Sequence, residues 1–280
     1  MNSNKIILLL KLTRPINFLI TAVSVLVGVI ICAKVPPSFL IILFAMLSAA
    51  FSSAGGNVIN DIVDIEIDKI SHPERALASN LISKKTAYIF YILLIAASIV
   101  LASMINLNSF ILVITANALL LLYSFYLKKI PLIGNLNVSI LTGLTFIYGG
   151  IVAGNISFAF LPAGFALLIN FIREIIKDMQ DVEGDSKNGV ITFPVKNGFG
   201  SAKKIVLIAS IVLIVITFVP FIFNFYKIGY FVLVMMIVNP MLVYNIKSLY
   251  DNHSNKNLKR LSGILKLAMV FGLAAIYFGK

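Results

Sequence analysis

Two acidic stretches of this 280-residue chain repeat one spacing of carboxylates. The pattern D-x-x-D-x-E-x-D begins at Asp61 and again at Asp178. Of the eleven acidic residues, only Asp251 lies outside the segments 61–74 and 174–185. Acid this concentrated, in a chain that is 60% hydrophobic, predicts a functional site.

The spacing places the aspartates of each stretch on one side of a helix. Residues three and seven positions apart lie on the same face at 3.6 residues per turn, whereas Glu66 and Glu183 point away toward solvent. Carboxylates on one face repel one another unless a cation lies between them, and hard oxygen ligands favour Mg²⁺. The alternative, two solvated helix ends, is weakened by the repeated spacing. The metal-binding aspartates expected from the spacing are Asp61, Asp64, Asp68, Asp178, Asp181 and Asp185.

Composition identifies the elements that must position these residues. Only 12% of the chain is charged, which excludes an ordinary soluble domain. A membrane-spanning helix needs about 20 mostly apolar residues. We therefore predict an all-α, polytopic membrane bundle of about nine transmembrane helices with a polar cap on the cytoplasmic side. The predicted spans are 16–33, 38–60, 86–104, 108–127, 132–152, 158–177, 203–223, 228–246 and 261–279.

The net charge of +12 is explained by topology. When nine spans are threaded from a cytoplasmic N-terminus, only Lys34, Lys227 and Lys280 fall outside, and the other Lys and Arg residues fall on the inner side. This asymmetry follows the positive-inside rule and argues against nucleic acid as the partner. We expect a multi-pass protein of the cell membrane whose N-terminus and two acidic stretches are cytoplasmic. The first apolar segment lacks a cleavage site and is expected to be retained.

Basic residues on the same predicted side complete a possible anion site. Arg14, Lys128 and Lys129 are either membrane anchors or ligands of phosphate oxygens, and Arg75 and Lys187 of the inner loops are further candidate ligands. Proteins usually hold Mg²⁺ with one or two carboxylates plus substrate phosphates. A diphosphate head beside an apolar helix bundle predicts a prenyl diphosphate as the substrate.

The order of features is similar in the two halves of the chain. An apolar span, an acidic face and a basic loop follow one another after residue 38 and again after residue 158. Span two also carries small residues, including Ser48, Ser52, Gly55 and Gly56, which should pack against other helices. We expect one transmembrane domain over residues 1–280, in which spans one to four are repeated by spans five to eight and span nine is added.

The acidic stretches resemble the signatures of the UbiA superfamily of intramembrane prenyltransferases. Its first signature, N-x-x-x-D-x-x-x-D, matches Asn60, Asp64 and Asp68, and its second, D-x-x-x-D, matches Asp181 and Asp185. The resemblance covers essentially the full chain. Within the superfamily, the stretches 55–61 and 173–185 are most similar to archaeal-type digeranylgeranylglyceryl phosphate synthases. The loop over residues 71–80 departs from the usual N-R-P-D-R-P pattern, although Arg75 remains.

The resemblance implies a Mg²⁺-dependent enzyme of ether-lipid biosynthesis. It would transfer a geranylgeranyl group from geranylgeranyl diphosphate to the hydroxyl of geranylgeranylglyceryl phosphate, a lipid phosphate acceptor. The implied catalytic residues are Asp64, Asp68, Asp181 and Asp185. The implied metal ligands are the same four with Asn60, Asp61 and Asp178. The implied diphosphate or phosphate ligands are Arg14, Arg75, Lys128, Lys129 and Lys187, and the substrate-cavity residues are Asn17, Asn57, Tyr123 and Tyr148.

Two alternatives remain open. An aromatic prenyltransferase acting on 4-hydroxybenzoate or a similar acceptor would share the metal signatures. A cation-coupled transporter would also combine a repeated bundle with intramembrane acids, but its binding sites lie near the bilayer midplane. The carboxylates of this chain are predicted at the cytoplasmic ends of helices, which favours the enzyme.

Overall fold

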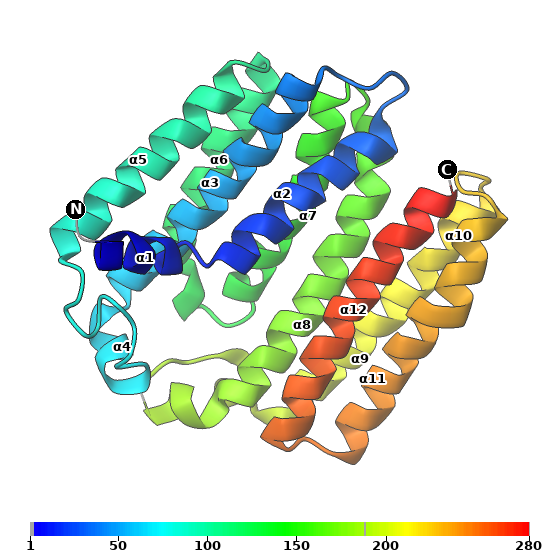
Figure 1. Ribbon diagram of the computed structural model, residues 1–280. Coiled ribbons are helices and arrows are strands. Elements are labelled where there is room, and N and C mark those ends of the chain that lie inside the picture. The colour runs from blue at the N-terminus through cyan, green and yellow to red at the C-terminus, as the bar shows by residue number, and fades with distance from the viewer. Residues whose placement is uncertain (1–2, 188, 280) are drawn as a thin grey trace. The chain divides into compact units, whose positions relative to one another are not determined.

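The computed structural model describes residues 3–187 and 189–279, and within these residues every regular element is a helix (Figure 1). The elements are α1 (Ser3–Leu12), α2 (Pro15–Cys32), α3 (Phe39–Val63), α4 (Ile65–Ser71), α5 (Lys84–Ser103), α6 (Leu107–Phe125), η1 (Leu127–Lys129), α7 (Ile133–Val152), η2 (Ile156–Ala159), α8 (Phe160–Lys187), α9 (Phe193–Ile222), α10 (Ile228–Leu233), the π-helix η3 (Val234–Val238), α11 (Asn239–Asp251) and α12 (Asn255–Gly279).

Nine helical segments in the described residues are long and apolar enough to cross a bilayer. The shortest, Pro15–Cys32, has 18 residues, which at about 1.5 Å per residue approaches the thickness of the hydrocarbon core. Capping residues mark several starts: the side chain of Ser83 accepts a hydrogen bond from Thr86 N (3.2 Å), and that of Asn106 accepts one from Ser109 N (2.8 Å). The predicted all-α, nine-span membrane bundle is confirmed.

The sixth and seventh spans differ from the prediction. The sixth continues to Lys187 instead of ending near 177, and the helix of the seventh begins at Phe193 instead of near 203. Hydropathy marks where apolar residues stop, but Lys, Glu, Gln and Met are good helix formers and extend α8 beyond that point. The seventh helix is kinked at Gly198, whose φ of 77° is in the left-handed region. The second acidic stretch therefore lies on a helix, as its spacing predicts.

The chain divides into two compact units. Unit 1 contains residues 1–128 and 144–159, and unit 2 contains residues 129–143 and 160–280. In unit 1, α3 lies between α2 and α5 and also contacts α1, α4 and α6 (Figure 1). The helix from which the first acidic stretch begins thus contacts five other helices of its unit.

Small residues allow the helices of unit 1 to approach closely, as expected in lipid. Ser52 and Ser98 join α3 to α5 through their hydroxyl groups (2.6 Å). A Cβ placed on Gly149 of α7 would lie 2.6 Å from the backbone of Gly28 in α2. The Ser52–Ser98 contact confirms the prediction that the small-residue face of span two packs against other helices.

The loop between α4 and α5 is anchored by apolar packing. Leu77 and Ile82 are buried with Ile59 and Ile62 of α3 in one hydrophobic cluster. This burial holds the loop, including Arg75, against the end of α3. The loop is therefore positioned by packing, although of the prolines in the pattern that it resembles it keeps only Pro73.

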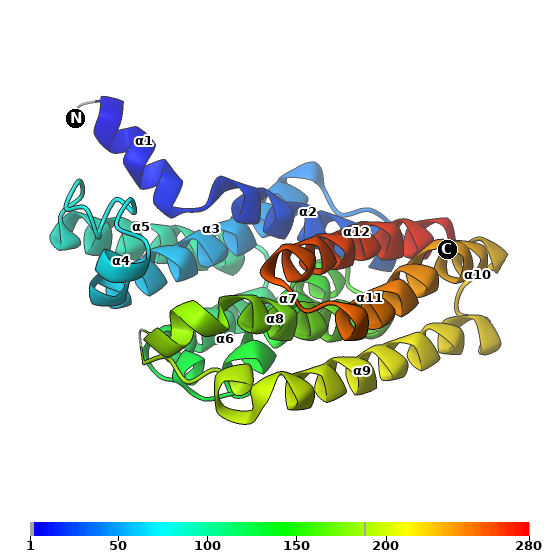
Figure 2. The same cartoon turned by 90° about the horizontal axis from the view of Figure 1, so that it is seen from below.

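In unit 2, four long helices form a bundle. Helix α8 contacts α9 and α12, and α11 also contacts both of these helices, as Figure 2 shows. The eighth span passes from α10 through η3 into α11, and Asn239 follows the π-helix directly. The Asn239 amide donates a hydrogen bond to Thr217 Oγ1 (3.2 Å), so this buried amide is satisfied next to Pro240.

Candidate metal and diphosphate site

Asn60, Asp61, Asp64 and Asp68 form the first cluster, at the end of α3 and in α4. The expected continuous helix is interrupted, because α3 ends at Val63 and Asp64 (φ −89°, ψ 5°) joins the two helices. The interruption is small. Asp64 N still donates to Asn60 O (2.9 Å), and Asp68 N donates to Asp64 O (2.8 Å). The helical spacing of these side chains therefore continues across the break.

Arg14 approaches the first cluster from the junction of α1 and α2. One of its guanidinium nitrogens donates to Asp61 Oδ1 at 2.8 Å, and Asp61 is only 5% exposed. The residue has a left-handed backbone (φ 51°) immediately before Pro15. The Asn57 amide donates to Thr13 O (3.1 Å) and ties this junction to α3. Asn57 was predicted as a cavity residue. In the structure, its contact with Thr13 helps to position Arg14.

Arg75 is the counter-ion of Asp68. Its Nη1 lies 2.7 Å from both carboxylate oxygens of Asp68 and 3.9 Å from Asp61 Oδ1. Burial lowers the pKa of Arg75, but its hydrogen bond to Asp68 and the negative charges of Asp68, Asp61 and Asp64 outweigh this effect and raise it. Arg75 is therefore a permanent cation beside a buried carboxylate.

Lys128 occupies the remaining part of the first cluster. Its Nζ donates to Asp64 Oδ1 and to Asn60 Oδ1 (3.3 Å). The Asn60 amide donates to the other Asp64 oxygen at 2.9 Å. A single cation is thus held by an amide oxygen and a carboxylate oxygen, and both Lys128 and Asp64 are largely buried.

The donor set of the first cluster suits a hard divalent ion, and here cations of the chain itself occupy it. Among the described residues, no three His, Cys, Asp or Glu side chains are arranged to hold a metal. Mg²⁺ does not require such a cage, because it usually keeps water and substrate phosphate oxygens as ligands. The Lys128 ammonium already binds two oxygens of the kind that Mg²⁺ prefers. The residues therefore fit the metal that the sequence predicts.

Asp178, Asp181 and Asp185 form the second cluster, on the last turns of α8. Asp178 is half-buried and accepts a hydrogen bond from the Asn135 amide of α7 (2.8 Å). Asp181 is exposed, and Asp185 is half-buried. The Val190 amide donates to the Asp185 carbonyl (2.9 Å) and closes the end of the helix.

The glutamates of the two acidic stretches lie outside the clusters, as predicted. Glu66 is exposed and pairs with Lys69 at 2.8 Å on the surface of α4. Glu183 is also exposed.

Sequence reasoning missed two residues near the second cluster. Glu174, one turn before Asp178, accepts hydrogen bonds from Arg173 (2.8 Å) and Lys177 (3.0 Å). The i, i+3 spacing of Glu174 and Lys177 was the available signal. The Asn135 contact joins residues 43 positions apart and had no comparable signal.

The other predicted site residues differ in exposure. Lys129, Lys187 and Asn17 are exposed, and Tyr123 is partly buried. Tyr148 is 2% exposed and packs among Val25, Val29 and other apolar residues of unit 1. The binding roles of these five residues stay predictions.

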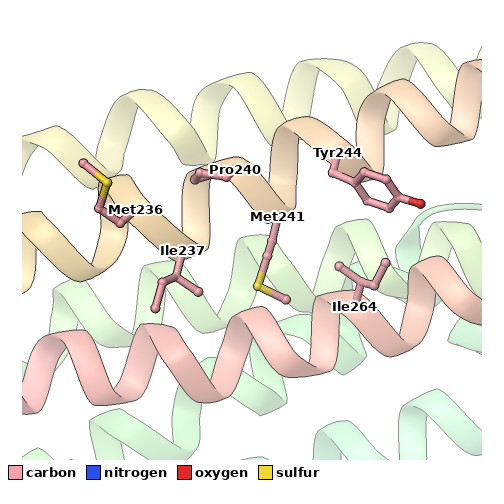
Figure 3. Close-up of a pocket in the computed structure, with 6 residues that line it drawn as sticks. All are labelled: Met236, Ile237, Pro240, Met241, Tyr244 and Ile264. Carbon is pink, nitrogen blue, oxygen red and sulfur yellow. The ribbon is translucent and has the colours of Figure 1, made fainter.

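Two cavities lie in unit 2. One, of about 350 Å³, is lined by Met236, Ile237, Pro240, Met241, Tyr244 and Ile264 (Figure 3). The other, of about 400 Å³, is lined by Met179, Gln180, Val182, Glu183, Phe199, His253, Ser254 and Asn255. Neither of these two is lined by a member of either cluster.

Comparison with known proteins supports one family over the whole chain. Residues 21–270 match the UbiA prenyltransferase family. A digeranylgeranylglyceryl phosphate synthase of Methanosphaera stadtmanae is 33% identical over 270 residues, covering 96% of this chain and 98% of the relative.

Solved structures agree with the sequence comparison. A structure described as a digeranylgeranylglyceryl phosphate synthase in membranes superposes with a TM-score of 0.85 at 30% identity, over 99% of this chain and 98% of that one. A UbiA homologue from Archaeoglobus fulgidus, bound to GPP and Mg²⁺, has a TM-score of 0.68 at 21% identity, over 96% of this chain and 99% of its own, and shares the fold.

Proposed function

Because this chain belongs to the UbiA prenyltransferase family, we propose that it transfers a geranylgeranyl group from geranylgeranyl diphosphate to the hydroxyl of geranylgeranylglyceryl phosphate. The observation that carries the proposal is the first cluster, in which carboxylates and cations alternate at the end of a membrane helix. The names and full-length similarity of the relatives support the choice of substrates.

We propose that both clusters hold Mg²⁺. The metal ligands would be Asn60, Asp61, Asp64, Asp68, Asp178, Asp181 and Asp185, with Asp64, Asp68, Asp181 and Asp185 essential for catalysis. Bound Mg²⁺ would neutralise the charge that develops on the diphosphate as it departs.

The chain's own residues would then assist the transfer. Arg14, Arg75 and Lys128 supply cations that can bind phosphate oxygens at the first cluster. The carbon–oxygen bond of the allylic diphosphate breaks, the acceptor hydroxyl forms the new ether bond, and the hydroxyl proton is released. Exclusion of water by the apolar helices would limit hydrolysis of the allylic cation.

The acceptor brings a second anion, and we propose that exposed Lys129 and Lys187 serve it. Neutralising either lysine should raise the KM for the lipid phosphate with little effect on that for the prenyl diphosphate, as expected when binding of one substrate is lost. A phenolic acceptor such as 4-hydroxybenzoate carries a carboxylate and no phosphate, so it would not require two further lysines.

We further propose that residues 1–280 act as one domain and that the N-terminus and both clusters are cytoplasmic. The Lys and Arg asymmetry supports this orientation. Reporter fusions after residue 75 and after residue 190 should give cytoplasmic signals, and fusions near residues 34 and 155 external signals. An external signal at residue 75 would contradict the orientation.

The decisive experiment is a product assay. Purified protein in lipid nanodiscs is incubated with labelled geranylgeranyl diphosphate, Mg²⁺ and either geranylgeranylglyceryl phosphate or 4-hydroxybenzoate, and products are identified by mass spectrometry. We expect the diether phosphate with the first acceptor. A comparable kcat/KM with 4-hydroxybenzoate would replace the proposal with the aromatic alternative.

A further inference from the structure

We propose that Lys128 is an internal counter-ion that keeps divalent metal out of the first cluster until a diphosphate arrives. Metal and diphosphate would then bind the first cluster together and not in independent steps. This inference rests on the proposed function, because it assumes that the first cluster binds a metal–diphosphate complex.

The position of Lys128 carries the inference. Its ammonium contacts Asn60 Oδ1 and Asp64 Oδ1, two oxygens proposed as metal ligands. A metal that takes both oxygens must displace the ammonium. The Lys128 side chain is 15% exposed and that of Asp64 16%, so little water screens the repulsion between an incoming metal and this lysine.

The charge balance of the first cluster points the same way. Asp61, Asp64 and Asp68 pair with Arg14, Lys128 and Arg75, respectively, so the three carboxylates are already neutralised. A bare divalent ion would leave a net positive charge in a half-buried place. A divalent ion with a diphosphate brings compensating negative charge and also offers phosphate oxygens to the displaced ammonium.

Lys69 provides the matched control. Its ammonium pairs with Glu66 at 2.8 Å on α4, but the two side chains are 43% and 82% exposed. Both lysines bind a carboxylate of the first acidic stretch. Only Lys128 binds one that is proposed to hold metal.

The test measures Mn²⁺ binding by electron paramagnetic resonance on the full-length protein in nanodiscs. The parent variant carries Asp178→Asn, Asp181→Asn and Asp185→Asn, so that binding reports the first cluster. Lys128→Gln, Lys128→Arg and Lys69→Gln are each added to it. Each variant is titrated with Mn²⁺ alone and with Mn²⁺ after saturation by a thiodiphosphate analogue of geranylgeranyl diphosphate. Thermal unfolding checks that each variant is folded.

We expect Lys128→Gln to bind Mn²⁺ alone at least about tenfold more tightly than the parent, because a like charge at contact distance is removed. Lys128→Arg and Lys69→Gln should stay within about threefold of the parent, since the former keeps the charge and the latter is solvent-screened. In the parent, the analogue should tighten Mn²⁺ binding by about tenfold or more. In Lys128→Gln this gain should be smaller.

Two results would overturn the inference in different ways. Equal Mn²⁺ affinity for Lys128→Gln and the parent, with a clear gain from the analogue in both, would reject the role of Lys128 and leave the proposed function standing. If the parent binds no Mn²⁺ even with the analogue, while the unsubstituted protein also binds none, the metal–diphosphate site of the proposed function fails together with the inference.

Discussion

The two acidic clusters share one spacing of aspartates but differ in how their charge is balanced. In the first cluster, the cations come from residues 14, 75 and 128, far apart in the chain, and each contacts a proposed metal ligand. Just before the second acidic stretch, Arg173 and Lys177 lie on the same helix and bind Glu174, which is outside the aspartate pattern. Asp178 accepts a neutral amide hydrogen bond instead.

This difference shows that the same aspartate pattern can depend on tertiary contacts in one place and on a single helix in another. The first cluster depends on tertiary contacts, because its cations reach it only when the α1–α2 junction, the α4–α5 loop and the short helix η1 are in place. The second stretch depends mainly on one helix. We therefore expect the clusters to contribute alike to catalysis and unequally to folding.

The largest expected effect tests what the clusters have in common. Removal of divalent metal with EDTA should abolish prenyl transfer, because the negative charge of the departing diphosphate would no longer be offset. Product formation is measured before chelation, after it, and after addition of excess Mg²⁺, which should restore it. Full turnover in EDTA would remove the metal from the mechanism.

Alanine substitutions compare the two clusters directly. Asp64→Ala and Asp68→Ala in the first cluster, and Asp181→Ala and Asp185→Ala in the second, should each lower kcat/KM by about 100-fold or more, comparable to the loss of a strong electrostatic contact. Steady-state kinetics on folded protein provides the measurement. Near-normal rates for both variants of one cluster would show that this cluster is not needed for catalysis. The two clusters would then share a sequence pattern but not a catalytic role.

Removing a cation near the first cluster should lower the free energy of unfolding more than removing one near the second. Arg75→Gln leaves the buried Asp68 carboxylate without its counter-ion and should reduce the free energy of unfolding by about 2 kcal/mol, less than for a fully buried pair because Arg75 is 31% exposed. Lys177→Gln removes a more exposed i, i+3 partner of Glu174 and should cost below about 1 kcal/mol.

Reversible unfolding in detergent compares these two variants. Equal losses of stability would contradict the view that only the first cluster depends on tertiary ion pairs.

The smallest effects are expected from the glutamates of the repeated pattern. Glu66→Gln and Glu183→Gln alter exposed side chains at matching positions and should change the free energy of unfolding by no more than about 0.5 kcal/mol. Turnover should stay within about twofold of the unsubstituted protein. A large loss in either variant would show that its glutamate belongs to the site.

Local patterns explain what could be predicted from the sequence. Hydropathy identified nine spans because the bilayer requires long apolar helices, and helical periodicity placed Asp64 and Asp68 in register. The extension of α8 to Lys187 was missed because its polar residues end the hydropathy signal without ending the helix.

The ion pairs between residues far apart in the sequence could not be predicted. Arg14 and Asp61 are 47 residues apart, and Lys128 and Asp64 are 64 apart. The sequence indicates that these cations lie on the same side of the membrane, but not which carboxylate each one binds. Only the packing of the α4–α5 loop and of the helix ends on α3 determines those pairs.

The π-helix between α10 and α11 has a consequence for the permitted length of the eighth span. Such a turn is usually equivalent to one residue inserted into an α-helix. The wide turn absorbs that extra residue, so α10 and α11 keep the relative rotation of an unbroken α-helix. Deleting one residue within Val234–Val238 should therefore restore regular winding while Tyr230 still faces Thr217 O, to which it donates a hydrogen bond (2.9 Å). A residue added to the regular helix between Tyr230 and the π-turn would instead rotate Tyr230 by about 100° away from this partner.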